Sequence, residues 1–140
     1  MYLLDTSFLA HALIPAQRTT GAGDALRRLV TGDAPVFMCS STLIEFGSLI
    51  RKLTTRQQLS VTESRDLMEQ ARDLATTFVA VSIEDVVEGF ELSVRLGQSD
   101  SFDATGYVVA QRLSASFWIC DRRFANAAQS AGLSSFELFQ

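Results

Sequence analysis

The sequence predicts one α/β domain, a three-layer α/β/α sandwich around a mostly parallel, five-stranded sheet. At 140 residues the chain has the length of a single domain, and it contains no internal repeat, low-complexity tract or Pro/Gly/Ser-rich linker. Short apolar runs alternate with longer segments of helical character. Runs that are apolar on both faces are typical of a parallel sheet covered by helices on each side. We therefore expect residues 1–140 to form one domain.

Five runs have the length and composition of buried strands. They lie between residues that favour turns or helix caps, and each is too short for a helix of ordinary length. In chain order they are Tyr2–Leu4, Val36–Cys39, Phe78–Val81, Ser116–Cys120 and Leu133–Phe136.

Capping residues and helix breakers mark the helices between these strands. Pro15 stops the first helix, Ser60 and Glu63 have the spacing of a capping box, and Gly97 is a natural C-terminal cap. The expected helices are Thr6–Leu13, Gly23–Val30, the segment from the cap cluster Ser40–Thr42 to Leu53, Ser60–Thr77, Ile83–Leu96, Ser101–Leu113 and Asp121–Ser130.

The composition excludes several kinds of site. Two Cys and one His are too few ligands for a Cys/His zinc site. A Ser-His-Asp or Cys-His catalyst would have to use His11, and a lone His is more often structural than catalytic. We expect His11 to be structural and Trp118, which lies within an apolar strand, to belong to the core.

Nothing in the chain indicates export or membrane insertion. Hydrophobic residues make up 47% of it, but no apolar run approaches the roughly 18 residues that a membrane-spanning helix needs. Asp5 interrupts any signal-peptide core. We expect a cytoplasmic protein with no membrane contact, in which Cys39 and Cys120 are buried, reduced thiols.

The charge balance is acidic, which at first argues against a nucleic-acid partner. The chain has 16 Asp and Glu against 12 Lys and Arg, for a formal net charge of −4, and its pI is about 4.9. A nucleic-acid-binding domain is normally basic.

Several of the carboxylates occupy positions where they can converge. Asp5 and Asp121 directly follow strands, Asp103 lies near the start of a helix with Asp100 three residues before it, and Glu45 lies inside an apolar helical stretch. Asp5, Asp100 and Asp121 are also good helix N-caps, and Thr42 with Glu45 fits a capping box. In a parallel α/β sheet, however, ligands bind beyond the carboxyl ends of the strands where the strand order reverses.

A cluster of these carboxylates requires a counter-charge. Two like charges about 4 Å apart repel by roughly 4 kcal/mol at an effective dielectric near 20. Oxygen-only ligation suits Mg²⁺ or Mn²⁺, and a carboxylate-held metal supports phosphodiester hydrolysis without a His, Cys or Ser nucleophile. If the five carboxylates belong to a metal site, removing their charge from the net −4 leaves +1 on the rest of the chain.

Four acidic segments in this order resemble the motifs of PIN-domain ribonucleases, and the length and motif order are similar to the VapC toxins of type II toxin–antitoxin modules. The segments are Leu4-Asp5-Thr6-Ser7, Glu45 in its apolar helix, Ser101-Phe102-Asp103-Ala104 and Cys120-Asp121-Arg122-Arg123-Phe124.

The resemblance implies an Mg²⁺- or Mn²⁺-dependent endoribonuclease in which Asp5, Glu45, Asp103 and Asp121 are the catalytic, metal-binding residues. Thr6 and Ser7 match the family's first-motif hydroxyls, which support the site through hydrogen bonds. Ile119 stands where many family members carry Thr or Ser, and Asp100 is an addition to the common pattern.

The resemblance also implies an RNA substrate, a cognate antitoxin and a homodimer. The helix pair between Ser40 and Thr77 is apolar on more than one face, as either a partner groove or a packed core would be. Arg122 and Arg123 are candidates for contacts to the RNA backbone.

Other functions remain open at this point. A phosphatase with Asp5 as nucleophile usually has a second acid two residues on, where this chain has Ser7. A receiver domain needs a Lys after a late strand, and the single lysine, Lys52, lies in another segment. A non-catalytic PIN-like binding module is the third alternative, and the presence of all four acids argues against it.

Overall fold

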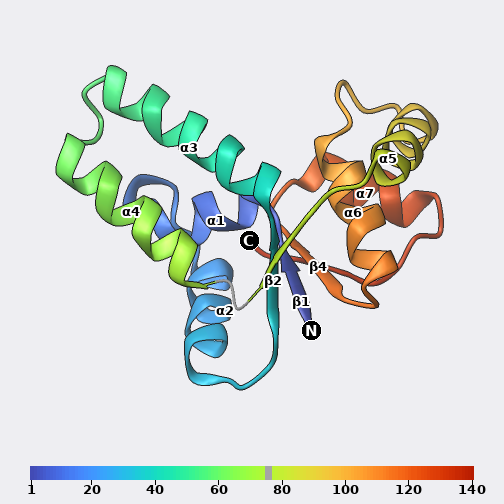
Figure 1. Ribbon diagram of the computed structural model, residues 1–140, viewed down its shortest axis with the longest axis horizontal. Coiled ribbons are helices and arrows are strands. Elements are labelled where there is room, and N and C mark those ends of the chain that lie inside the picture. Colours follow the sequence, from blue (N-terminus) through green and yellow to red (C-terminus); the bar gives the residue numbers. More distant parts are fainter. Residues whose placement is uncertain (75–76) are drawn as a thin grey trace.

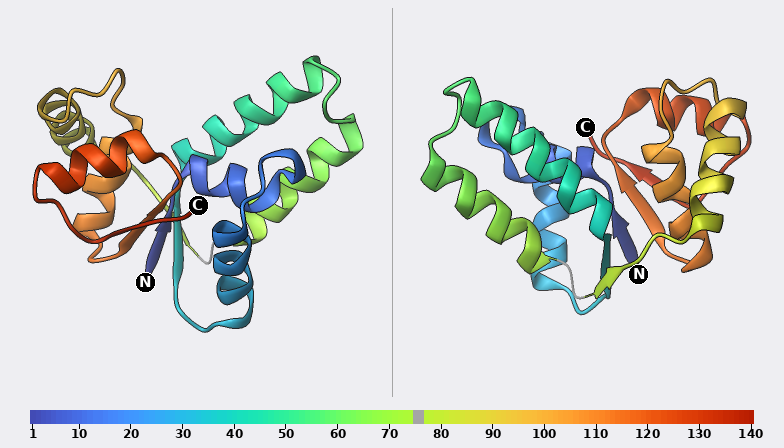
Figure 2. Two further views of the ribbon diagram at one scale, coloured as in Figure 1. Left: turned by 180° about the vertical axis from the view of Figure 1, so that it is seen from behind. Right: turned by 45° about the horizontal axis from the view of Figure 1, so that its top comes forward.

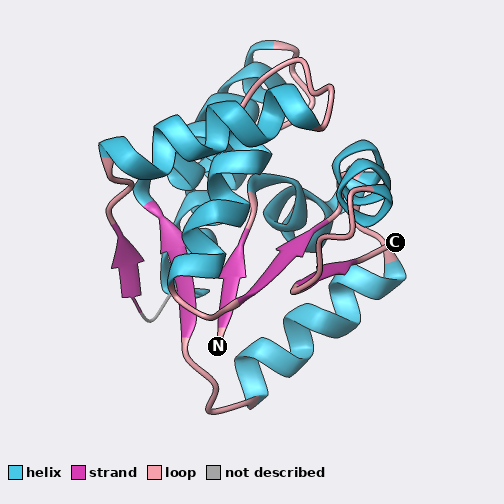
Figure 3. Cartoon of the chain, turned by 90° about the vertical axis from the view of Figure 1, so that its right-hand side faces the viewer, coloured by secondary structure: helices cyan, strands magenta, loops and turns pink. Residues whose placement is uncertain are grey.

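The sheet contains five parallel strands in the order β3-β2-β1-β4-β5 (Figure 3). The computed structural model describes residues 1–74 and 77–140. The strands are β1 (Tyr2–Leu4), β2 (Val36–Cys39), β3 (Thr77–Val79), β4 (Ser116–Ile119) and β5 (Phe136–Leu138). The predicted α/β class and five-stranded sheet are therefore confirmed, and the sheet is parallel throughout.

Helices cover both faces of this sheet (Figures 1 and 2). The first group consists of α1 (Thr6–Leu13), α2 (Thr20–Thr31), α3 (Ser40–Thr55) and α4 (Val61–Leu74), with a short 3₁₀ turn, η1, at Pro15–Gln17. The second group consists of α5 (Ile83–Arg95), α6 (Phe102–Arg112) and α7 (Arg122–Ser130). In Figure 1 the first group lies on the left of the strands and the second on the right, so the three layers are visible directly.

Each face of the sheet has its own apolar core because successive side chains of a strand point to opposite sides. In β4, Trp118 packs in the core beneath the first helix group, whereas Phe117 packs in the core beneath the second. In β1, Leu4 packs in the first of these cores and Leu3 in the second. Trp118 is 2% exposed, which confirms that it is a core residue.

The order of the strands creates a switch point at the centre of the sheet. From β1 the chain adds β2 and then β3 on one side, and it later adds β4 and β5 on the other side of β1. The carboxyl ends of β1 and β4 are therefore neighbours from which the connections leave in opposite directions, and this is where ligands bind in open parallel sheets.

The last predicted strand is misplaced: β5 begins at Phe136, not Leu133. Gly132 has a φ of +74°, and the Leu133 N–H donates to the carbonyl of Ala128, so Leu133 completes the end of α7. Ser135 also has a positive φ, which turns the chain into the sheet only after that residue.

Several other boundaries differ from the predicted ones. The helix α2 begins at Thr20 because the Thr19 hydroxyl accepts from the Ala22 N–H and caps it. The predicted helix to Thr77 ends at Leu74 in the structure, and Thr77 already belongs to β3, while residues 75–76 lie outside the described part of the chain. No helix among the described residues is both long enough and apolar enough to span a membrane.

A partly buried ion pair joins α5 to α6 within the second helix group. Asp85, 4% exposed, caps α5 together with Ser82 and accepts two hydrogen bonds from the Arg112 guanidinium, at 2.9 and 2.8 Å. The contact with Arg112 holds the pKa of Asp85 below its ordinary value. The two helices approach closely because position 89 is Gly: a Cβ there would lie 2.6 Å from the Thr105 Cα.

We predict that Asp85→Ala lowers the free energy of unfolding by about 2 kcal/mol at pH 7, since it removes a cap and a charge-assisted pair. Because the folded-state pKa of Asp85 lies below its unfolded value, this contribution is complete above the unfolded pKa and is lost as the pH falls through the folded one. Urea unfolding at several pH values measures the difference.

The control for this experiment is Asp24→Ala, which removes the exposed ion pair between Asp24 and Arg27. We expect that variant to change stability by less than about 0.5 kcal/mol. Equal effects of the two substitutions at pH 7 would contradict the role given to Asp85.

Candidate functional site

Asp5 and Asp121 meet at the switch point because their strands pair. Asp5 directly follows β1 and caps α1, and Asp121 follows β4 and caps α7. The Asp5 N–H donates to the Trp118 carbonyl at 3.0 Å, which continues the β1–β4 ladder up to the first carboxylate. Both residues are thus helix N-caps and also parts of a common cavity.

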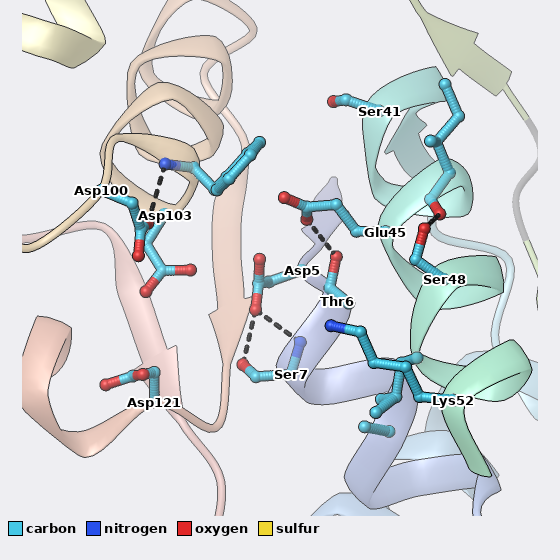
Figure 4. Close-up of a pocket in the computed structure, with 14 residues that line it drawn as sticks. Asp5, Thr6, Ser7, Ser41, Glu45, Ser48, Lys52, Asp100, Asp103 and Asp121 are labelled. Carbon is cyan, nitrogen blue, oxygen red and sulfur yellow. Dashed lines mark hydrogen bonds between the residues drawn. The ribbon is translucent and has the colours of Figure 1, made fainter. Parts of the chain in front are cut away.

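The cavity has a volume of about 660 Å³, and its walls come from α1, α3, the α5–α6 loop, α6 and the end of β4. All five carboxylates singled out in the sequence line it: Asp5, Glu45, Asp100, Asp103 and Asp121. Figure 4 shows Asp103 and Asp5 facing Glu45 across the cavity, with Asp121 below them. The structure therefore brings together every predicted site residue.

Hydroxyl groups hold two of these carboxylates in place. Oδ2 of Asp5 accepts from the backbone N–H of Ser7 at 2.7 Å and from the Ser7 hydroxyl, which itself accepts from the Cys120 N–H at 2.9 Å. The Thr6 hydroxyl donates to Oε2 of Glu45 at 2.6 Å. The expected supporting hydrogen bonds of Thr6 and Ser7 are present, and those of Ser7 connect Asp5 to the strand end that carries Asp121.

Two of the structural alternatives are wrong. Thr42 and Glu45 form no capping box, because α3 already begins at Ser40 and Glu45 bonds Thr6 instead. Asp100 does not cap α6: its N-cap is Ser101, and Asp100 accepts from the Phe102 N–H at 3.3 Å in the preceding loop. Asp100 therefore reaches the cavity from a loop, while Asp103 reaches it from the first turn of α6.

The sequence model of the PIN domain family matches residues 2–129 of this chain. The chain belongs to the PIN domain family. No curated protein matches its sequence.

Solved structures show the same fold. VapC20 of Mycobacterium tuberculosis, described as a toxin that cleaves the sarcin-ricin loop, aligns with a TM-score of 0.68 and 19% identity over 96% of this chain and 98% of its own. VapBC2 of Rickettsia felis, bound to a promoter DNA fragment, aligns with a TM-score of 0.68 and 15% identity over 99% of this chain and 98% of its own. FitAcB of Neisseria gonorrhoeae aligns with a TM-score of 0.68 and 16% identity over 98% of this chain and 97% of its own.

The carboxylates of this PIN domain are under electrostatic strain. Burial, reinforced by the charges of the neighbouring carboxylates, raises the pKa of Asp103 from 3.8 to about 8. Burial also raises the pKa of Asp5, against the lowering effect of the Ser7 hydrogen bonds, and it raises that of Glu45. No arginine is among the described residues that line the cavity, so these charges lack an internal guanidinium partner.

The donor set suits a hard divalent cation. Every candidate ligand is a carboxylate oxygen, as Mg²⁺ and Mn²⁺ prefer. Within residues 1–74 and 77–140, however, no three Asp, Glu, His or Cys side chains surround one point as metal ligands. The carboxylates line one cavity from different elements, so holding a cation would require their side chains to rotate toward a common point.

Lys52 is a cavity residue that the sequence analysis did not single out for this site. It lies on α3 seven residues after Glu45, two turns along the same helix face, and Figure 4 shows its ammonium group directed toward the carboxylates. The i, i+7 spacing was the available signal. Among the described lining residues it is the single cation.

The other basic candidates and His11 do not line this cavity. Arg122 donates to the side chain of Gln140 at 2.7 Å. His11 lies on α1 with a buried Nδ1 that has no hydrogen-bond partner among the described residues. Ile119 is fully buried, so the position where many relatives carry a hydroxyl contributes only to the core.

The two cysteines are free thiols. Cys39 is buried as expected, whereas Cys120 is only partly buried. Burial raises the pKa of Cys39 to about 11 and that of Cys120 to about 12, so neither is an activated nucleophile.

We predict that Asp103→Asn raises the free energy of unfolding in EDTA at pH 8 by about 1 kcal/mol or more, because it removes a buried charge from the cluster. The folded-state pKa of Asp103 lies above its unfolded value. Its contribution to the free energy of unfolding is therefore complete below about pH 4 and is lost as the pH rises toward 8. Urea unfolding of both proteins at pH 5 and pH 8 measures the effect.

The matched control is Asp33→Asn, an exposed loop residue outside the cavity. It should leave stability within about 0.5 kcal/mol of the native value at both pH values. A native-like or lower stability of Asp103→Asn at pH 8 would show that Asp103 carries no electrostatic cost.

Proposed function

We propose that this PIN domain is an Mg²⁺- or Mn²⁺-dependent endoribonuclease and the toxin of a toxin–antitoxin pair. The observation that carries the proposal is the convergence of five carboxylates, unpaired with any arginine lining the cavity, at the switch point of a parallel sheet. Such a cluster is costly unless it has a cationic ligand. Family membership and the fold shared with VapC20 support a nuclease.

Asp5, Glu45, Asp103 and Asp121 would hold the metal. When bound, a divalent cation there supplies an activated water and neutralises the charge that develops on the phosphoryl oxygens. Ser7 and Thr6 orient the carboxylates of Asp5 and Glu45 through their hydrogen bonds. Asp100 is an additional carboxylate at the rim.

Lys52 suits the backbone of an RNA strand. Its ammonium group lies two turns along α3 from Glu45, on the same wall of the cavity. A phosphate next to the scissile one would lie within its reach and would offset the charge of the carboxylate end. We also retain Arg122 and Arg123, at the start of α7, as outer contacts to the RNA backbone.

The alternatives fit the geometry less well. Asp5 is 7% exposed, and its Oδ2 is engaged by both donors of Ser7, which suits a positioned ligand better than a phosphatase nucleophile. A binding module without catalysis would not need four acids in one cavity at an electrostatic cost.

An antitoxin partner is the second part of the proposal. The Rickettsia felis and Neisseria gonorrhoeae structures are VapBC2 and FitAcB, and a further similar structure is FitAB bound to a DNA fragment. A groove of about 570 Å³ between α3 and α4 is available to a partner segment. A neighbouring small reading frame with a DNA-binding N-terminus would support this partner, and its absence would favour a stand-alone nuclease. A cytoplasmic location fits an RNA substrate.

We predict that the nuclease cleaves single-stranded RNA with Mg²⁺ or Mn²⁺ and stops in EDTA. Asp5→Asn and Asp103→Asn should each lower the rate by at least about 100-fold, because each removes a charged ligand. Gel analysis of a labelled RNA measures this, and Asp33→Asn should cleave at the native rate. If Asp5→Asn and Asp103→Asn cleave as well as the native protein, the assigned site is wrong.

We also propose a homodimer that forms through α5. This helix exposes an apolar stripe at positions i, i+3, i+4, i+7 and i+11: Ile83, Val86, Val87, Phe90 and Val94, each at least 49% exposed. In an antiparallel pair of these helices, Glu84 near one end would face Arg95 of the second copy, while the same register would set Glu88 against Glu91. The apolar stripe, and not charge pairing, therefore carries this proposal.

Sedimentation analysis tests the dimer. The native protein should sediment as a dimer and Phe90→Glu as a monomer, because the charge would be buried at the centre of the stripe. Val30→Glu, a change at a similarly exposed residue of α2, should remain dimeric. A native monomer at micromolar concentration excludes this interface.

A further inference from the structure

A second, smaller cavity lies beside the carboxylate cavity. It has a volume of about 250 Å³ and is bounded by the carboxyl ends of β1 and β2 and by α3, α5 and α6. The two cavities share Asp5, Ser41, Glu45 and Phe102. We call the smaller one the side cavity; anything bound in it would lie directly next to a phosphodiester held by the carboxylates.

Phe102 forms the boundary between the two cavities and is exposed. It is the first residue of α6, it precedes Asp103, and its N–H donates to Asp100. Its side chain is 61% exposed. Phe78 and Phe90 are exposed as well, but neither lines either cavity, whereas Phe102 lines both. An exposed aromatic ring beside a phosphodiester site is the usual platform for a stacked base.

The wall of the side cavity contains hydroxyl groups without partners. Thr42 is 8% exposed, and the structure shows no hydrogen bond from its hydroxyl, which is not among the fully buried, unpaired polar atoms of the described residues and is therefore open to the cavity that Thr42 lines. Ser41, Ser101 and Thr105 also line the cavity, and the structure shows no hydrogen bond from their hydroxyls. The rest of the wall is largely apolar, including Leu3, Val81 and Phe117.

We propose that the side cavity takes one nucleobase of the RNA, with the base stacked on Phe102 and its edge hydrogen-bonded by the hydroxyls of Thr42 and its neighbours. Unstacked bases of single-stranded RNA are recognised in this way, through an aromatic face and polar contacts to the base edge. The inference rests on the proposed ribonuclease function and assigns the part of the site that selects the base.

The size and lining of the side cavity favour a base over other occupants. Its volume lies below the range of about 300–1,000 Å³ that is typical of drug-sized ligands, so a single planar ring system suits it better than a whole nucleotide. The apolar wall disfavours a phosphate, and the unpaired hydroxyls disfavour a purely apolar side chain.

The first experiment measures stacking directly. An RNA oligonucleotide with 2-aminopurine at one position is bound to Asp5→Asn protein in Mg²⁺, so that it remains uncut. We expect 2-aminopurine fluorescence to be quenched, and Phe102→Ala to abolish the quenching and to weaken binding roughly 5- to 150-fold, the range for loss of one stacked base. Phe102→Trp should retain both, and Phe78→Ala, an exposed Phe that lines neither cavity, should behave as the parent.

Salt dependence separates stacking from charge. A stacked ring releases no counterion, so Phe102→Ala should leave the slope of log affinity against log salt unchanged. Lys52→Gln should reduce that slope by about 0.7, as expected for one lost phosphate contact to a single strand. Arg51→Gln is the control, because Arg51 lines the groove between α3 and α4, away from the carboxylates.

Base selection is tested with four oligonucleotides that differ only in the base at the cleavage site. Thr42→Val replaces the hydroxyl by a methyl group of similar size and should alter the preference among the four bases. Phe102→Ala should reduce the preference and the cleavage rate together. Phe102→Ala changes an exposed residue and Thr42→Val keeps the size of the side chain, so both variants should fold as the native protein does. Thermal unfolding measures this.

The outcomes distinguish the two proposals. If the native protein cleaves RNA but Phe102→Ala and Thr42→Val bind, cleave and select as the native protein does, the base pocket is wrong and the ribonuclease stands. If those variants only lose affinity for an antitoxin, the side cavity is a protein-docking site and the base pocket is again wrong. If the native protein cleaves no RNA with either metal, both proposals fail.

Discussion

The pairing of β1 with β4 is the contact on which the site of this PIN domain depends. It places the residues that follow the two strands side by side, and the hydrogen bond from the Asp5 N–H to Trp118 extends the pairing as far as the first carboxylate. Ser7 then connects Asp5 to the Cys120 N–H, one residue before Asp121. The two carboxylates are therefore placed by the pairing of the strands together with the hydrogen bonds of Ser7.

The same geometry imposes an electrostatic cost. Carboxylates that would repel one another in water are gathered in a partly dehydrated cavity, and the pKa of Asp103 is raised to about 8 as a result. The fold compensates through apolar cores on both faces of the sheet and through the Asp85–Arg112 pair between α5 and α6. Stability is thus supplied by residues remote from the cavity, and the strain is confined to the place where a cation would relieve it.

The acidic net charge of the chain is consistent with an RNA substrate once its location is known. Five of the 16 acidic residues line one cavity, and the remaining charges are nearly balanced. The net charge is a sum over the whole chain, whereas an RNA strand interacts with the charges of the local surface that it contacts. Lys52 and the exposed Phe102 give that local surface a cation and an aromatic face next to the carboxylates.

The sequence by itself determined the alternation of strands and helices, the parallel sheet and the residues that form the acidic cluster. These features depend on local patterns: apolar runs such as Val36–Cys39, caps such as Ser60 and Asp121, and carboxylates that directly follow strands. The start of β5 and the partner of Glu45 were decided only by the tertiary structure, because a turn at Gly132 and the approach of α1 to α3 depend on contacts between distant segments. The roles of Lys52, Thr42 and Phe102 were hidden for the same reason: their positions become meaningful only when α3 and α6 pack around the ends of β1 and β4.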